Sequence, residues 1–212
     1  MAVLVDLFST LKKLEVVEIK TDWDYPSDLV VESLVNNNPN LHHLDISTSS
    51  PYILIRDSDE LSSRSLILLA EKCPQLTHIG IGYLTMFSSF SITKLVTNCP
   101  KLKHANFEET MVDNTALAKM STNCLDLEYL KISNCTSITQ GGLERFVYPA
   151  YAANLKCLDI SNDYYSPIFT SENDLRMSPF LLKLMIDLPN LEIVTVFDDD
   201  DGDYYASDDE ED

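Results

Sequence analysis

Histidine and cysteine are the residues of this chain that could serve as nucleophiles, general bases or metal ligands. The adjacent His42 and His43 would point to opposite faces of a strand. The sequence contains no CxxC pair, and no cysteine has the neighbours of a zinc site or of a catalytic dyad. Phosphate-binding glycine loops, GxSxG and HExxH are also missing from the sequence. We therefore expect no catalytic residues, no metal and no cofactor, and we interpret the chain as a binding protein rather than an enzyme.

An apolar pattern of the form L-x-x-L-x-L recurs seven times, with substitutions, and its clearest copy occupies Leu127–Phe146. The first positions of successive copies are 27, 35, 26, 25, 28 and 36 residues apart, so the period is close to 26 and the two longer spacings hold insertions. The copies begin at Leu14, Leu41, Leu76, Leu102, Leu127, Leu155 and Leu191.

Each copy combines a short strand with a helix. Apolar residues alternate within the pattern, as in a half-buried strand, and recur every three or four residues after it, as on one face of a helix. Stacked units of this kind form an α/β solenoid with a parallel sheet on its concave side and helices on its convex side. The predicted helices are Asp28–Asn36, Leu61–Lys72, Ser91–Asn98, Asn114–Asn123, Gln140–Val147 and Ser178–Asp187.

Three of the five cysteines, Cys73, Cys99 and Cys124, occupy equivalent places in successive repeats. A free cysteine behaves as a small buried hydrophobe, so we expect these thiols to fill the space between stacked repeats. The odd number of cysteines and the lack of a secretory signal indicate a reducing compartment, the cytoplasm or the nucleus.

Some of these motifs are typical of a known family. Cys73-Pro74 and Cys99-Pro100 precede the next repeat, and Asn134-Cys135 is followed by Ile138-Thr139. Over about residues 11–197 the chain resembles the cysteine-containing leucine-rich repeats of F-box/leucine-rich-repeat proteins. The resemblance implies a horseshoe-shaped leucine-rich-repeat solenoid of about seven repeats that recruits substrates to a cullin–RING ubiquitin ligase, while a separate F-box docks the adaptor. About ten residues precede the first repeat, too few for an F-box, so we expect ligase components as partners only if the chain is part of a longer one.

One column of residues on the concave side collects most of the histidines. It holds the residue before the second apolar position of each repeat, namely Val16, His43, His78, His104, Tyr129, Cys157 and Ile193. Because neighbouring strands lie about 4.8 Å apart, we expect the three imidazoles to form a ladder that ends on Tyr129. They could simply stack, or they could form a pH-sensitive or metal-competent recognition strip. The neighbouring outward positions that complete this candidate surface are Asp45, Asn106, Glu108, Glu109, Lys131 and Asp159.

Two insertions form a second candidate surface. Residues 47–60 follow the second strand and residues 162–173 the sixth, so both leave the same edge of the solenoid. Exposed aromatic residues are favoured binding anchors, but these loops could equally fold back over the sheet. The residues that we expect to contact a partner are Tyr52, Ile55, Tyr164, Tyr165 and Phe169.

The net charge of −19 restricts the class of partner. No basic cluster is present to hold phosphates, so we expect no nucleic acid, and no apolar run reaches the length of a membrane span. We expect a leucine-rich-repeat domain over residues 1–197 and a disordered tail over residues 198–212, ten of which are acidic. The tail could solubilise the chain or attract a basic protein, and Ser207 precedes acidic residues as in a casein-kinase-type phosphorylation site.

The sequence thus predicts a protein–protein interaction module, of the substrate-recognition type found in F-box/leucine-rich-repeat ubiquitin ligases. The alternative is a stand-alone scaffold or acidic chaperone that binds a basic protein such as a histone. We also expect the N-terminal residues to supply at most one apolar turn, which would leave the first repeat under-protected.

Overall fold

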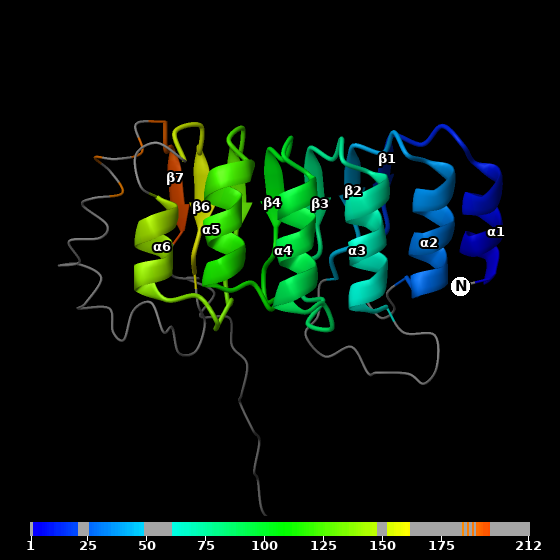
Figure 1. Cartoon of the computed structure of the whole chain (residues 1–212), viewed down its shortest axis with the longest axis horizontal. Coiled ribbons are helices and arrows are strands. Elements are labelled where there is room, and N and C mark those ends of the chain that lie inside the picture. The colour runs from blue at the N-terminus through cyan, green and yellow to red at the C-terminus, as the bar shows by residue number, and fades with distance from the viewer. Residues whose placement is uncertain are drawn as a thin grey trace, which may run out of the picture.

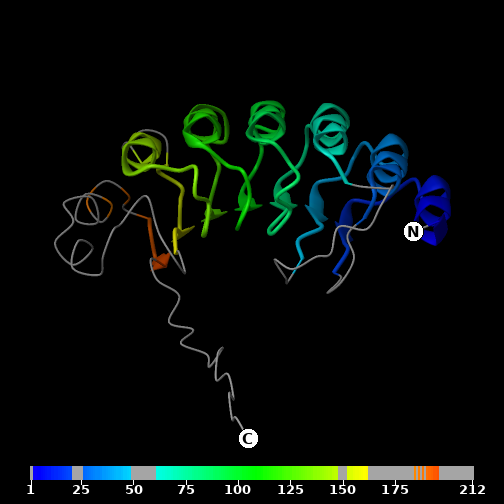
Figure 2. The same cartoon turned by 90° about the horizontal axis from the view of Figure 1, so that it is seen from below.

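A computed structural model shows a single curved layer of strands covered by a layer of helices (Figures 1 and 2). It describes residues 2–20, 26–48, 61–147, 152–161, 184, 186, 188 and 190–195. The strands line the inner side of the arc and the helices its outer side, as Figure 2 shows. The predicted leucine-rich-repeat solenoid is therefore confirmed.

The seven strands form one parallel sheet in which the strand order follows the sequence order. The register is constant, because the same repeat position pairs in every neighbouring pair of strands. The strands are β1 (Val16–Glu18), β2 (His43–Asp45), β3 (His78–Gly80), β4 (His104–Asn106), β5 (Tyr129–Lys131), β6 (Cys157–Asp159) and β7 (Ile193–Thr195).

In β1 to β6 the middle residue of each strand is buried beneath the helices. Leu44, Ile79 and Leu130 are buried in this way, and the residues on either side of them face the concave surface. The helices lie within a few residues of their predicted bounds. They are α2 (Asp28–Asn37), α3 (Ser63–Lys72), α4 (Ser89–Asn98), α5 (Asn114–Asn123) and α6 (Gln140–Phe146).

Different side chains form hydrogen bonds with the backbone at the two ends of the helices. At the start of α5, the Asp113 carboxylate accepts hydrogen bonds from the N–H groups of Thr115 and Ala116, both at 2.9 Å. At the helix ends the recurring cysteines form a ladder between repeats. The Cys99 thiol donates to the Cys73 carbonyl and the Cys124 thiol to the Cys99 carbonyl, each at 3.7 Å. The predicted burial of these three thiols is confirmed.

The N-terminal segment corrects one expectation. Instead of a single apolar turn it forms α1 (Ala2–Thr10), which packs beside α2. Phe8 is buried, and the Ser33 hydroxyl on α2 donates to the Val5 carbonyl at 3.0 Å. Apolar residues three and four positions apart give α1 one buried face, whereas Val3 on its other side is 78% exposed.

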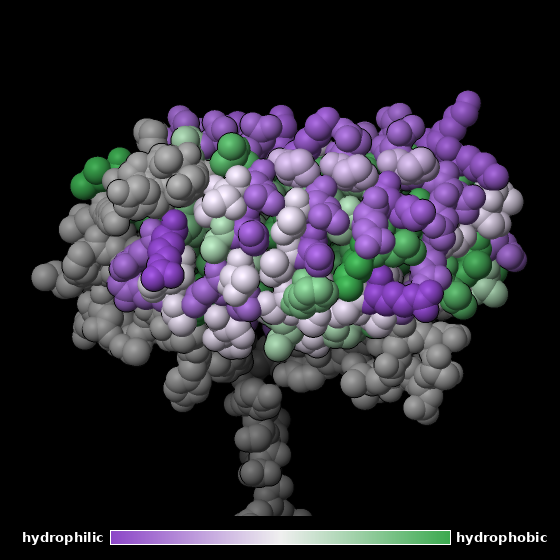
Figure 3. Space-filling view, viewed as in Figure 1, coloured by the Kyte–Doolittle hydropathy of each residue, from purple (hydrophilic) through white to green (hydrophobic). Residues whose placement is uncertain are grey.

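The convex face, seen in Figure 3, is mostly hydrophilic, with small scattered apolar patches over the helices. Within the described part of the chain, no helix has the length and apolar character needed to cross a membrane.

Several predicted features lie outside the described residues. They include the tail over residues 198–212 with Ser207, and nearly all of the two insertions. Thr48, at the start of the first insertion, still continues the sheet by donating its N–H to the Gly82 carbonyl at 3.2 Å. Of the predicted helix Ser178–Asp187, the structure describes Leu184 and Ile186 in helical conformation.

Candidate functional site

Four rings stack in a column along the concave surface. His43 and His78 have ring centroids 4.9 Å apart, and His78 and His104 have centroids 4.3 Å apart, with interplanar angles of 8° in both pairs. Tyr129 continues the column at 5.9 Å from His104 with an angle of 20°. The parallel register places these residues directly opposite one another on adjacent strands. The predicted ladder ending on Tyr129 is confirmed.

The environment of His78 and His104 favours their neutral forms. Burial lowers the pKa of His78, and the neighbouring His104, His43, His42 and Lys103 lower it further because they repel a positive charge. Burial also lowers the pKa of His104, although the Glu128 carboxylate partly opposes the shift. The Nδ1 atom of His78 shares a 2.8 Å hydrogen bond with the Thr77 hydroxyl. Two central rings of the ladder are therefore largely uncharged at neutral pH.

The same stacking argues against a metal site on the ladder. Nearly parallel rings direct their nitrogen lone pairs along parallel lines, whereas a metal ion needs ligands that converge on one point. Among the residues that the structure describes, no group of three or more histidine, cysteine or acidic side chains could hold a metal ion.

A second column runs along the C-terminal ends of the strands and holds Asp45, Gly80, Asn106, Lys131 and Asp159. Three of its polar members share one local geometry. The side-chain Oδ1 of Asp45, of Asn106 and of Asp159 accepts the backbone N–H two residues further on, at 2.9, 3.1 and 3.0 Å. These three side chains are therefore held in place where the chain leaves the sheet.

Three of the predicted contact residues are partners of one another. The Lys131 Nζ lies 2.8 Å from a carboxylate oxygen of Glu108 and 3.8 Å from one of Asp159. The Tyr83 hydroxyl donates to Glu108 at 3.1 Å. Burial by itself lowers the pKa of Lys131, but the hydrogen bond and charge of Glu108 and the charge of Asp159 raise it above its usual value. With Tyr83 included, this network ties together four successive repeats on the concave face.

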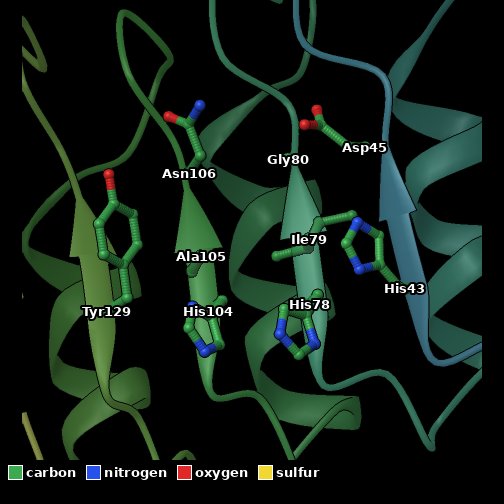
Figure 4. Close-up of a pocket in the computed structure, with 9 residues that line it drawn as sticks. All are labelled: His43, Asp45, His78, Ile79, Gly80, His104, Ala105, Asn106 and Tyr129. Carbon is green, nitrogen blue, oxygen red and sulfur yellow. The ribbon is translucent and has the colours of Figure 1, made fainter. Parts of the chain in front are cut away.

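A groove of about 170 Å³ lies beside the ladder. In Figure 4 the Asp45 carboxylate and the Asn106 amide stand on either side of Gly80, and the rings stand nearer the N-terminal ends of the strands. A side chain at Gly80 would collide with the Asp45 carboxylate, so the position of this carboxylate at the groove depends on the glycine. The groove is lined by His43, Asp45, His78, Ile79, Gly80, His104, Ala105, Asn106 and Tyr129.

Most of the predicted concave residues thus meet at the groove, and Glu108, Lys131 and Asp159 form the adjoining network. Sequence reasoning missed three lining residues: Ile79 and Ala105, which it assigned to the buried side of their strands, and Gly80. The sequence did offer a sign of Gly80: the equivalent position is a glycine in this repeat but Asp45 in the repeat before it and Asn106 in the repeat after it. The predicted loop residues Tyr52, Ile55, Tyr164, Tyr165 and Phe169 lie outside the described residues.

Buried cysteines are poor nucleophiles here. Burial raises the pKa of Cys73 and of Cys135 to about 11, and that of Cys99 and of Cys124 to about 12. Thiols with such pKa values stay protonated at neutral pH. Cys157, which follows Tyr129 in the ladder column, is partly exposed, and burial raises its pKa as well.

The repeat architecture and the concave groove define a leucine-rich-repeat protein. No family model and no curated protein matches the chain. Solved structures match the fold. A chain of the Rad7 and Elc1 complex from yeast shares 14% identity and a TM-score of 0.58, and the match covers 96% of this chain and 55% of that one. The chain therefore spans about half the length of that relative.

Two bacterial leucine-rich-repeat structures are more distant. An internalin from Listeria monocytogenes shares 13% identity and a TM-score of 0.47, over 92% of this chain and 53% of that one. The protein LegL7 from Legionella pneumophila shares 10% identity and a TM-score of 0.37, over 90% of this chain and 86% of that one. At these identities the likeness concerns the fold.

Proposed function

We propose that this chain is a protein-binding module whose partner lies on the concave surface across β2 to β5. The observation that carries the proposal is the groove over Gly80, bordered by the ring ladder on one side and by Asp45 and Asn106 on the other. A curved sheet presents such residues from several repeats to one partner at the same time. The two insertions, with Tyr52, Ile55, Tyr164, Tyr165 and Phe169, would extend the contact surface.

Within this class, we favour substrate recognition of the F-box/leucine-rich-repeat type. The support is the resemblance in the cysteine-containing repeats, to which the ladder of Cys73, Cys99 and Cys124 adds a structural counterpart. The similar yeast chain was crystallised in a complex of Rad7 and Elc1. In this role, cullin–RING components would join through other parts of a longer chain.

A basic partner is the second candidate, and a specific observation favours it. The chain carries a net charge of −19, and ten of its 34 acidic residues lie within residues 198–212. Such a charge accelerates association with a basic protein and makes the complex sensitive to salt. In this role the chain would be a stand-alone scaffold or an acidic chaperone of proteins such as histones.

Affinity capture with matched variants tests the proposal. The full chain would be compared with His78→Ala, at the centre of the ladder, and with Phe90→Ala, which removes a 63% exposed ring from α4 on the convex side. We expect the partner to be lost from the His78→Ala sample and kept by the Phe90→Ala sample, with both variants folded. Equal recovery in all three samples would refute binding on the concave surface.

The identity of the captured proteins separates the two candidates. Substrate recognition predicts cullin–RING components together with a substrate. The acidic scaffold predicts histones or similar basic proteins, whose recovery falls steeply between low and physiological salt. Removal of residues 198–212 should weaken capture only in the second case.

A further inference from the structure

Among the described residues, Asp45 is the charged member of its column that forms no ion pair. Glu18, one strand away, pairs with Lys20 at 3.1 Å and with His43 at 3.4 Å. Lys131 and Asp159 belong to the network described above. Among the described residues, no lysine, arginine or histidine lies within ion-pair distance of Asp45. Its Oδ1 atom accepts the Ser47 N–H, and no donor among the described residues forms a hydrogen bond with Oδ2.

The size of the groove limits what can enter it. Pockets for drug-sized ligands and cofactors measure about 300–1,000 Å³, whereas this groove measures about 170 Å³. The space therefore suits one side chain of a partner rather than a nucleotide or a cofactor. The carboxylate of Asp45 packs against Gly80, at the place where a side chain would otherwise stand, and it lines the groove.

We propose that the groove over Gly80 receives an arginine side chain of the protein partner, with its guanidinium bound by the Asp45 carboxylate and its stem lying along the edges of the His78 and His104 rings. This inference rests on the proposed function, because it names the chemistry of the partner at the same surface.

Charge and shape both favour arginine. A guanidinium presents several N–H donors in one plane, so it can bind Asp45 Oδ2 and a second acceptor together, which a lysine ammonium does less well. In Figure 4 the oxygen of the Asn106 amide points away from Asp45, and this oxygen accepts the Glu108 N–H. The flat faces of His78 are covered by His43 and His104, so the ring edges face the ligand. Neutral imidazoles do not repel a cation, and burial keeps His78 and His104 in that form.

The variant Asp45→Asn separates the charge of this residue from its structural role. Asparagine keeps the acceptor for the Ser47 N–H, just as Asn106 accepts the Glu108 N–H two repeats further on. Asp159→Asn is the matched control. It removes one negative charge from the same column and the same type of turn, but Asp159 does not line the groove.

The test selects random dodecapeptides, displayed on phage, against the immobilised full chain. We expect arginine to be enriched in the selected peptides. In fluorescence polarisation, Asp45→Asn should weaken the binding of a selected peptide about ten- to hundredfold, as expected for the loss of a charge-assisted hydrogen bond. Asp159→Asn should leave the affinity nearly unchanged. Replacement of the peptide's arginine by citrulline should weaken binding to the native chain but add little to the effect of Asp45→Asn.

The outcomes separate this inference from the proposed function. Peptides without enriched arginine, or equal effects of Asp45→Asn and Asp159→Asn, would overturn the arginine site. If such peptides still lose affinity for His78→Ala, concave binding stands and only the arginine site fails. A selection that yields no binding peptide would count against both.

Discussion

Replacement of Lys131 by methionine tests whether the concave ion-pair network stabilises the solenoid. Methionine keeps an unbranched apolar stem but removes the ammonium, and it leaves two carboxylates without their shared cation. Glu108 and Asp159 are 13% and 14% exposed, and Lys131 is 26% exposed. Exposed ion pairs contribute about 0–1 kcal/mol, whereas breaking a buried pair costs about 3–5 kcal/mol. For this partly buried network we expect a loss of about 2 kcal/mol in the free energy of unfolding.

Urea denaturation followed by circular dichroism measures this loss. In a thermal scan, 2 kcal/mol corresponds to a decrease of about 4–8 °C in Tm for a domain of this size. The control is Lys103→Met, which removes a 46% exposed lysine that lies 3.7 Å from Glu128. That variant should lose less than about 1 kcal/mol. The double variant Lys131→Met, Glu108→Gln should recover part of the stability, because one of the unpaired carboxylates is gone.

The pH dependence gives a second measurement on the same variant. The pKa of Lys131 is raised in the folded chain, so its stabilising contribution is complete below the ordinary value of 10.5 and is lost as the pH rises through the folded value. The difference in stability between the native chain and Lys131→Met should therefore narrow at strongly alkaline pH. If Lys131→Met costs no more than Lys103→Met, the network does not stabilise the fold, and Lys131 is instead available to a partner.

Three further predictions concern the rest of the molecule. Asp113→Ala should lower the free energy of unfolding by about 1 kcal/mol, because two N–H groups at the start of α5 lose their acceptor; an unchanged urea midpoint would contradict this cap. In the native chain at pH 8, a thiol reagent should modify Cys157 first, because the other cysteines are buried. If peptide mapping finds a buried cysteine modified first, the packing of these thiols between the repeats would be contradicted. His78→Gln should lose less stability than the native chain between pH 7.5 and 5.5. The pKa of His78 is lowered by folding, so its contribution is complete above the ordinary value of 6.5 and is lost as the pH falls toward the folded value; parallel stability curves for the two proteins would refute this.

The repeat spacing determined much of the architecture. Because each unit places its strand and its helix at nearly the same distance along the chain, the helix Asn114–Asn123 could be predicted with its observed bounds. The stack of His43, His78, His104 and Tyr129 followed from the same regularity, since equivalent repeat positions pair in a parallel sheet in constant register. Local patterns suffice where every repeat obeys the same geometry.

The tertiary structure decided which polar side chains form ion pairs and hydrogen bonds with one another. Glu108, Lys131 and Asp159 are candidate contact residues in the sequence, but their side chains meet across adjacent strands and form ion pairs. The packing of α1 beside α2 likewise depends on contacts between the two helices, and the apolar pattern of neither helix specifies its partner. The sequence by itself determined the period, the strands and the columns, because these depend on spacing along the chain. Only the folded sheet decided that the Asp45 carboxylate packs against Gly80 and that a groove lies beside the ladder, because a hollow is defined by the side chains of neighbouring strands.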